Sequence, residues 1–201
     1  MRYRWELLNG LSRVFSLGVY LEIGVRSGLC INQIEVNVKH GVDIARKRQE
    51  DFPGVILHHL HSDRFFEELD SEARFDLIFI DGCHSEGQVS RDISNSLGRL
   101  SNGGFVVCHD CNPKTQDMMA LNRNGECWQA VVQLRISEPN VRVVTFDFDH
   151  GLSVICLDQV RRAFNVSEDW RNWNWLNQHR QEALNLVPDS FFPAAIKAET
   201  P

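Results

Sequence analysis

One segment near the N-terminus constrains the fold of this chain more than any other. Residues 19–28 read VYLEIGVRSG, an apolar run that includes one acid, Glu22, and passes into a turn containing Gly24 and Gly28. A second apolar run ends at Asp43, about 20 residues after the first acid, which is the spacing of one βαβ nucleotide-binding unit. Such a unit places both acids and the turn at the carboxyl edge of a parallel sheet, where open α/β sheets bind their ligands.

The rest of the chain continues this alternation of strand and helix patterns. Short apolar runs predict strands, and apolar residues at spacings of three and four predict the helices between them. Residues 147–151 separate the last two runs and are typical of a hairpin turn. Repeated βα units require a parallel sheet, so we expect a Rossmann-like, doubly wound α/β fold with a mostly parallel, seven-stranded sheet and a C-terminal antiparallel hairpin. The predicted strands cover residues 19–23, 38–42, 55–60, 75–80, 105–108, 141–146 and 152–157, and the predicted helices cover 4–17, 29–34, 45–51, 65–69, 85–100 and 128–134.

The pattern changes after residue 158, and we expect the chain to have two parts. Residues 1–158 are predicted to form a ligand-binding domain with its N-terminal helix, and residues 159–201 a helical, aromatic-rich extension. Three tryptophans lie among polar residues at 170–175, and residues 182–186 show a short helical pattern that stops at Pro188. We interpret the extension as a docked helical segment or as a contact in a homo-oligomer. Packing explains its aromatic residues more simply than a role in lining a pocket for sugars or flat rings.

Composition excludes several classes of partner. The formal net charge of −6 and the pI near 5.7 argue against non-specific binding to nucleic acid or to an anionic membrane. No apolar stretch approaches the roughly 20 residues that cross a bilayer, and the N-terminus lacks the apolar core of a secretory signal. The 6 cysteines lack the spacing of a disulfide scaffold, so we expect free thiols in a reducing compartment and a cytoplasmic protein.

Four segments together carry a family resemblance. They read LEIGVRSG at 21–28, GVD at 41–43, DLIFIDGCH at 76–84 and GGFVVCHD at 103–110. In this order and spacing they resemble the class I S-adenosylmethionine-dependent methyltransferases, and more closely the branch that methylates hydroxyls on sugars and other small metabolites. The resemblance covers residues 15–158. It implies a methyltransferase that takes S-adenosyl-L-methionine as cofactor and methylates an oxygen of a small-molecule or glycan acceptor.

The resemblance assigns the cofactor site to the ends of three strands. Gly24 and Gly28 leave room where a ligand touches the backbone and where a helix starts. Glu22 is the implied partner, through water, of the amino group of the methionine moiety. Asp43 is the implied acceptor for both ribose hydroxyls, a paired contact that suits a carboxylate. The resemblance also assigns Asp81, at the end of the fourth predicted strand, to the cofactor site.

Three further positions bear on the cofactor. Ser62 and Asp63 follow the third strand, where the family reads the amino edge of adenine, and a helix N-cap is an alternative and compatible interpretation of the pair. Arg26 replaces the middle glycine found in many relatives. This change disfavours a dinucleotide site, in which the backbone must approach a pyrophosphate. We expect the side chain of Arg26 to take one of two positions. It reaches toward the substrate or the carboxylate of the cofactor, or it lies in solvent.

Acids and histidines follow the fourth and fifth strands, and we expect them to converge at one sheet edge. In one mechanism Asp81 and Asp110 bind Mg²⁺, with Asn112 completing an oxygen-rich shell, and the metal lowers the pKa of a substrate hydroxyl. In the other, His84 or His109 removes the hydroxyl proton directly, since imidazole titrates near neutral pH. Asp81, His84 and His109 are therefore the candidate catalytic residues.

Several different functions are compatible with the same pattern. A zinc site at Cys108 and Cys111 has the CxxC spacing but lacks a second clustered pair, which disfavours it. A nicotinamide-dependent oxidoreductase is disfavoured by Arg26 and by the terminal hairpin. A metal-dependent hydroxylase and a non-catalytic binding protein could be built on the same scaffold, because fold alone does not determine chemistry.

Overall fold

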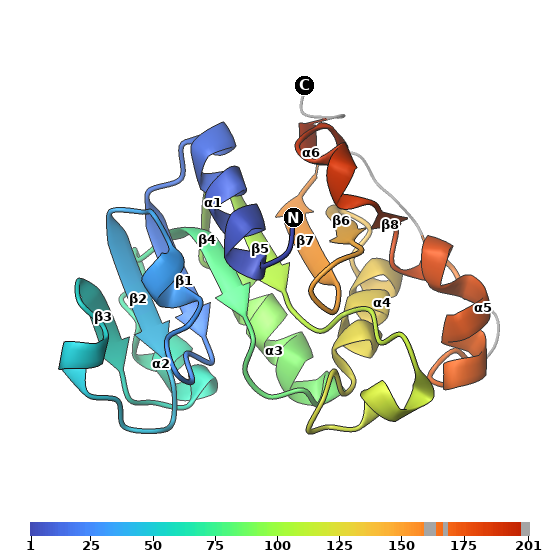
Figure 1. Cartoon of the computed structure of the whole chain (residues 1–201), viewed down its shortest axis with the longest axis horizontal. Coiled ribbons are helices and arrows are strands. Elements are labelled where there is room, and N and C mark those ends of the chain that lie inside the picture. The colour runs from blue at the N-terminus through green and yellow to red at the C-terminus, as the bar shows by residue number, and fades with distance from the viewer. Residues whose placement is uncertain (159–163, 167–168, 198–201) are drawn as a thin grey trace.

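The computed structural model describes residues 1–158, 164–166 and 169–197, and its centre is one eight-stranded sheet (Figure 1). The strand order is β3-β2-β1-β4-β5-β7-β6-β8. Strand β7 runs antiparallel to both of its neighbours, and the other paired strands are parallel. The predicted Rossmann-like fold is confirmed, with one strand more than expected. The strands are β1 (Val19–Ile23), β2 (Val38–Val42), β3 (Val55–His58), β4 (Phe75–Ile80), β5 (Leu100–Cys108), β6 (Val141–Phe146), β7 (Leu152–Leu157) and β8 (Leu186–Val187).

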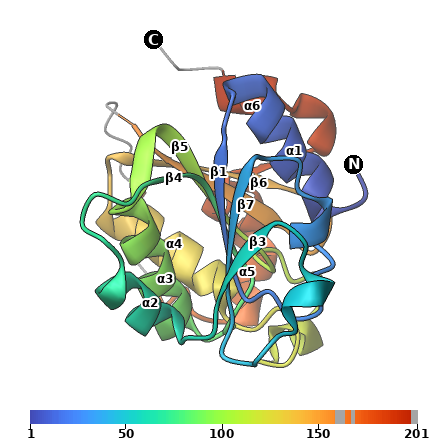
Figure 2. The ribbon, with the colours of Figure 1, turned by 90° about the vertical axis from the view of Figure 1, so that its left-hand side faces the viewer.

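Helices cover both faces of the sheet (Figure 2). Helices α2, α3 and α4 lie on one face and α1 on the other. The α-helices are α1 (Arg4–Phe15), α2 (Ser62–Glu68), α3 (Glu86–Leu97), α4 (Cys127–Ser137), α5 (Trp173–Ala183) and α6 (Ala194–Lys197). Short 3₁₀ turns form η1 (Ile31–Gln33), η2 (Gln49–Asp51), η3 (Gln116–Met119) and η4 (Asp189–Phe191). None of the described helices is long and apolar enough to cross a membrane.

Alternation of side chains along the strands produces two hydrophobic cores. In β4, Ile78 and Ile80 are buried in the core that includes α2, α3 and α4, whereas Leu77 and Phe79 are buried in the core that includes α1. A strand buried on both faces reads as a continuous apolar run. The central strands therefore hold the carboxyl edge of the sheet in a fixed position.

Two predicted helices are wrong. The connections at 29–34 and 45–51 contain only the 3₁₀ turns η1 and η2. The first hydrogen-bonded turn of a helix fixes several residues for a single bond, and in both connections the helical segment ends after one 3₁₀ turn. Smaller differences concern boundaries: β3 ends at His58, β5 already begins at Leu100, α3 ends at Leu97 and α4 extends to Ser137.

The C-terminal extension also differs from its prediction. Its helix α5 begins earlier than expected, because the side chain of Asn172 caps it by accepting a hydrogen bond from the Trp175 backbone N–H at 3.0 Å. Asn185, with φ of 46°, ends the helical segment, and Leu186–Val187 pairs with β6 as β8, where a helix was predicted. Trp170 is buried against Trp128, as the packing interpretation expects. Residues 159–163 of the extension lie outside the described residues.

Candidate functional site

The loops after β1 to β4 enclose an open pocket of about 270 Å³ at the carboxyl edge of the sheet. We call it the edge pocket. Its position is the one that the sequence predicts for a ligand site. It is lined by Ile23, Gly24 and Arg26, by Val42, Asp43 and Ile44, by Leu60, His61 and Ser62, by Asp81, Gly82 and Cys83, and by Gln88 and Asp92 of α3.

Both predicted glycines are required by the packing of the chain itself. Gly24 has φ of +90°, and a Cβ there would lie 2.3 Å from the carbonyl oxygen of Asp81. Gly28 has φ of +80°, and a Cβ there would lie 2.4 Å from the ring of Phe52. Only glycine combines this backbone conformation with such close approach. Gly24 lines the edge pocket, whereas Gly28 supports the loop from outside its lining.

Asp43 lies in the pocket and also shapes its wall. Its Oδ2 accepts a hydrogen bond from the Arg26 backbone N–H at 2.8 Å, and its Oδ1 accepts one from the Ala45 N–H at 2.8 Å. The ammonium of Lys47 lies 3.3 Å from Oδ2. The carboxylate therefore holds the loop after β1 in place, with Arg26 at φ of 48°. Its predicted contact with ribose stays a prediction.

The two residues predicted to read adenine are separated by the structure. Ser62 is buried and lines the edge pocket, whereas Asp63 is not part of the lining. The carboxylate of Asp63 accepts a hydrogen bond from Gln88 Nε2 at 3.0 Å and lies 3.4 Å from Arg91 Nε. The N-cap interpretation of the pair is wrong, because His61 is the N-cap residue of α2.

Glu22 is buried beneath the site, on the side of β1 that faces α1. Its Oε2 accepts a hydrogen bond from the hydroxyl of Tyr20 at 2.6 Å, and it is not part of the edge-pocket lining. Burial raises the pKa of Glu22 to about 8, although hydrogen bonds from Tyr20 and Cys30 oppose this shift. The carboxyl is thus mainly protonated at neutral pH. Its predicted role toward the cofactor amino group stays a prediction.

The raised pKa of Glu22 gives an expected dependence of stability on pH. Between the ordinary value of 4.5 and about 8, the folded state holds a proton that the unfolded state has released. The stabilisation from this group is therefore complete below pH 4.5 and is lost as pH rises toward 8. Within that window we expect Glu22 to make the free energy of unfolding fall by about 1.4 kcal/mol per pH unit.

The Glu22→Gln variant tests this expectation, because glutamine keeps an acceptor for the Tyr20 hydroxyl and does not titrate. Urea unfolding at about pH 5.5 and about pH 7.5 should show the variant gaining stability relative to the natural protein as pH rises. Parallel stability curves for the two proteins would show that the Glu22 pKa is not raised by folding.

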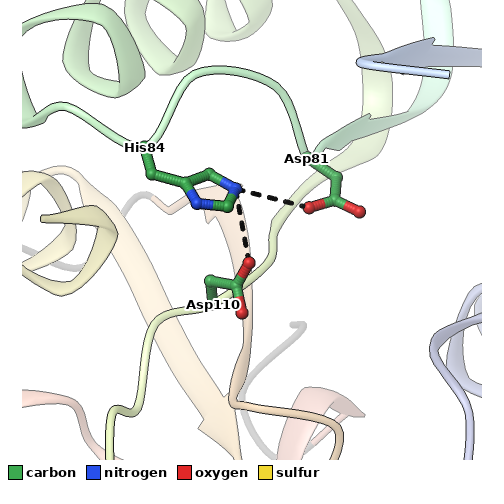
Figure 3. Close-up of side chains that lie close together, drawn as sticks. All are labelled: Asp81, His84 and Asp110. Carbon is green, nitrogen blue, oxygen red and sulfur yellow. Dashed lines mark ion pairs between the residues drawn. The ribbon is translucent and has the colours of Figure 1, made fainter. Parts of the chain in front are cut away.

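A second group of side chains lies beside the edge pocket, and we call it the acid–histidine cluster: Asp81, His84, His109 and Asp110. Asp81 follows β4 and Asp110 follows β5, and His84 points between them (Figure 3). His84 Nε2 lies 3.8 Å from Asp81 Oδ1 and 3.4 Å from Asp110 Oδ2. The predicted convergence of these residues at one sheet edge is observed.

His109 is the buried centre of this cluster, with 3 % of its surface exposed. Its Nδ1 lies 3.1 Å from Asp81 Oδ1 and 3.0 Å from Asp110 Oδ2, and its Nε2 lies 3.4 Å from Asp149 Oδ1. Burial by itself lowers the pKa of His109, but the three carboxylates together raise it well above the usual value. A histidine held as a cation in this way orders the acids. It is less suited than the more exposed His84 to accept a proton from a substrate.

Two residues of the site were not predicted. Arg4, at the start of α1, donates a hydrogen bond from Nη1 to Asp81 Oδ2 and another from Nε to Asp149 Oδ2 at 3.1 Å. Asp149 lies in the hairpin turn between β6 and β7 and bridges Arg4 and His109. The sequence marks Asp149 only as a turn residue and Arg4 only as part of a helix. Tertiary packing alone brings them together.

Asn112 does not complete a metal shell, which corrects a prediction. It is fully buried, donates to Asp147 Oδ1 at 2.8 Å and accepts a hydrogen bond from Arg180 at 2.6 Å. Cys108 and Cys111 are buried in the core and do not belong to a group of side chains that could hold a metal ion among the described residues. In the described parts of the chain, the group that can hold a metal ion is Asp81, His84 and Asp110.

A second recess adjoins the edge pocket at the acid–histidine cluster. Asp81, Gly82, Cys83 and Arg26 line both hollows. His84, Ser85, Leu121 and Asn122 complete the second recess. Gly125 lets the loop after η3 pack against His84, because a Cβ there would lie 2.6 Å from the Cβ of His84. Two ligands could thus meet at Asp81.

Comparison with known proteins supports a methyltransferase domain and the fold. Residues 21–111 match the family model described as a methyltransferase domain. Among solved structures, a methyltransferase from Podospora anserina bound to S-adenosylhomocysteine is 19 % identical, with a TM-score of 0.60 over 79 % of this chain and 80 % of that one. A protein provisionally described as an O-methyltransferase from Klebsiella pneumoniae is 17 % identical, with a TM-score of 0.59 over 77 % and 80 %. One provisionally described as a caffeoyl-CoA O-methyltransferase from Staphylococcus aureus is 16 % identical, with a TM-score of 0.58 over 78 % and 84 %. A comparison with curated protein sequences finds no match.

The matched segment runs from within β1 to just beyond β5 and contains the wall that both hollows share. The match and the fold shared with these structures support an S-adenosylmethionine-dependent methyltransferase.

Proposed function

We propose that this enzyme transfers the methyl group of S-adenosylmethionine to a hydroxyl oxygen of a sugar or another small metabolite. The observation that carries the proposal is the meeting of the edge pocket with the second recess at Asp81, beside His84 and Asp110. Methyl transfer requires a donor and an acceptor in contact, and two adjoining hollows meet that requirement.

We propose one orientation for the donor in the edge pocket. Its ribose hydroxyls would be hydrogen-bonded to Asp43, and its adenine would lie between the side chains of Ile44 and Cys83, which both line the pocket. Ile44 is an apolar side chain that is 75 % exposed in the ligand-free protein, and a flat ring would cover it. This orientation directs the sulfonium toward Asp81 and the second recess.

His84 is the candidate general base. In the proposed reaction it takes the proton of the acceptor hydroxyl while the oxygen attacks the methyl carbon. The carbon–sulfur bond breaks, its electron pair stays on sulfur, and S-adenosylhomocysteine leaves as a neutral thioether. The Asp81 carboxylate, with Oδ1 3.8 Å from Nε2, raises the pKa of His84, which strengthens it as a base. Arg4 and His109 hold the Asp81 carboxylate in position for this task.

The acid–histidine cluster also fits a divalent cation. Asp81, His84 and Asp110 each offer one ligand atom, and these atoms lie within 4.8 Å of one another. Two carboxylates meet the preference of Mg²⁺ for oxygen, and the imidazole widens the choice to other divalent metals. When bound there, such a cation would lower the pKa of the acceptor hydroxyl.

The Asp43→Ala variant tests the donor site. We expect it to weaken binding of S-adenosylhomocysteine by about tenfold or more without unfolding the protein, because it removes a charged acceptor from the ribose and an anchor from the loop after β1. Isothermal titration calorimetry measures the affinity, and far-ultraviolet circular dichroism checks the fold. Asp51→Ala, in η2 and outside the pocket lining, is the control. Unchanged affinity in Asp43→Ala, or stabilisation of the natural protein by NAD and not by S-adenosylhomocysteine, would contradict the proposal.

A further inference from the structure

One buried carboxylate in the edge pocket lacks a hydrogen-bond partner on one of its oxygens. Asp92, on α3, is 1 % exposed and lines the pocket floor. Its Oδ1 accepts a hydrogen bond from Gln88 Nε2 at 3.0 Å, whereas its Oδ2 has no hydrogen-bond partner among the described residues. A buried acceptor left unsatisfied costs roughly 1–3 kcal/mol. An oxygen of this kind at a ligand pocket therefore indicates a donor that the ligand supplies.

The neighbouring polar groups at this end of the pocket are already engaged. Gln88 Nε2 lies within hydrogen-bond distance of Ser62 Oγ, Asp63 Oδ1 and Asp92 Oδ1, and Gln88 Oε1 accepts a hydrogen bond from Arg91. Asp63 is held by Gln88 and Arg91 and is not part of the lining. Asp92 Oδ2 is therefore the buried acceptor at this end that has no hydrogen-bond partner among the described residues.

Burial also raises the pKa of Asp92, a shift that the neighbouring side chains of Ser62 and Gln88 only partly oppose. A carboxyl in this state accepts a hydrogen bond from a neutral N–H more readily than it holds a full ion pair. The donor molecule carries one neutral amino group, on its adenine. With the ribose at Asp43, the adenine extends toward Ser62 and Asp92, which line the same pocket.

We propose that Asp92, rather than Asp63, accepts the hydrogen bond of the adenine amino group and thereby selects adenine over other purines. The proposal rests on the proposed donor site. Gln88 acts as the positioning residue, because its amide holds Oδ1 of Asp92 and leaves Oδ2 without a partner among the described residues.

Calorimetry with two ligands tests this assignment. S-inosylhomocysteine differs from S-adenosylhomocysteine at the purine 6-position, where an oxygen replaces the amino group. The natural protein should bind the adenosyl compound about tenfold or more tightly, since the inosyl compound would place an acceptor against an acceptor. In Asp92→Asn, Gln88 still requires an acceptor, so the new amide N–H₂ should occupy the place of Oδ2. The variant should therefore lose the preference or reverse it.

Asp63→Asn is the matched control, because it removes the other carboxylate bonded to Gln88 without touching the lining. It should keep the natural preference. Asp92→Ser, which removes Oδ2 and leaves an acceptor for Gln88, should bind both ligands about equally and replaces Asp92→Asn if that variant does not fold. An unchanged preference in the Asp92 variants, or a preference lost only in Asp63→Asn, would overturn the assignment. Failure of the natural protein to bind either ligand would instead overturn the proposed function, and the assignment with it.

Discussion

The Asp81→Asn variant is expected to lower the turnover number for methyl transfer by about 10³-fold while remaining folded. Asp81 lines both hollows and contacts Arg4, His84 and His109. Burial alone raises the pKa of Asp81, but the two histidines and Arg4 hold it well below the usual range. The charge that the variant removes is therefore fully present at neutral pH. Asparagine keeps the shape of the side chain, and Asp110 and Asp149 still neutralise the nearby cations.

Formation of S-adenosylhomocysteine in the presence of a panel of sugar and small-metabolite hydroxyls measures this loss. Asp76→Asn is the matched control, because Asp76 lies in the same strand but at its opposite end, where it accepts hydrogen bonds from the N–H groups of Gly18 and Val19. It should reduce stability slightly and leave turnover unchanged. A larger loss of turnover in Asp76→Asn than in Asp81→Asn would show that the chemistry lies elsewhere.

The Gly24→Ala variant should show the largest loss of stability, about 3 kcal/mol, together with loss of donor binding. Alanine at φ of +90° costs about 1–2 kcal/mol. Its Cβ would also lie 2.3 Å from the Asp81 carbonyl oxygen, so that the loops after β1 and β4 have to separate. Overpacking of this kind adds about 1–3 kcal/mol. Because these loops form the wall shared by both hollows, the ligand site should be distorted as well.

Gly54→Ala separates the two causes. Gly54 also has positive φ, +72°, but a Cβ there would have no atom within 4 Å. Urea unfolding should therefore give a loss of about 1 kcal/mol for Gly54→Ala, from backbone strain alone, and normal donor binding. Equal losses in the two variants would mean that the close approach of Gly24 to Asp81 does not contribute to stability.

The sequence predicts the parts of this site that follow from strand order. Parallel strands bring their carboxyl ends to one edge, so Asp43, Asp81 and Asp110 could be placed there from the ends of apolar runs alone. Arg4 and Asp149 could not be placed in this way. Each reaches the site from an element whose position depends on tertiary packing rather than on a local pattern.

Dependence on tertiary packing also explains the predictions that were wrong within single segments of the chain. Asp63 and Asp92 are both acids near one end of the edge pocket, but only the packing of α2 against α3 decides which of them faces the pocket. The connections after β1 and β2 carry apolar residues that are compatible with helices, yet each forms only a 3₁₀ turn, because a short apolar pattern alone does not offset the cost of helix nucleation. β8 has only two residues, too few for a strand pattern to be recognised.

A crystal structure with bound S-adenosylhomocysteine tests the central claim most directly. The proposed function predicts the ribose hydroxyls at Asp43, the adenine between Ile44 and Cys83, and the sulfur atom facing the acid–histidine cluster from the edge-pocket side. An acceptor placed in the second recess would then meet the methyl group beside His84. A ligand bound outside the edge pocket, or a sulfur directed away from Asp81 and His84, would contradict methyl transfer at this site.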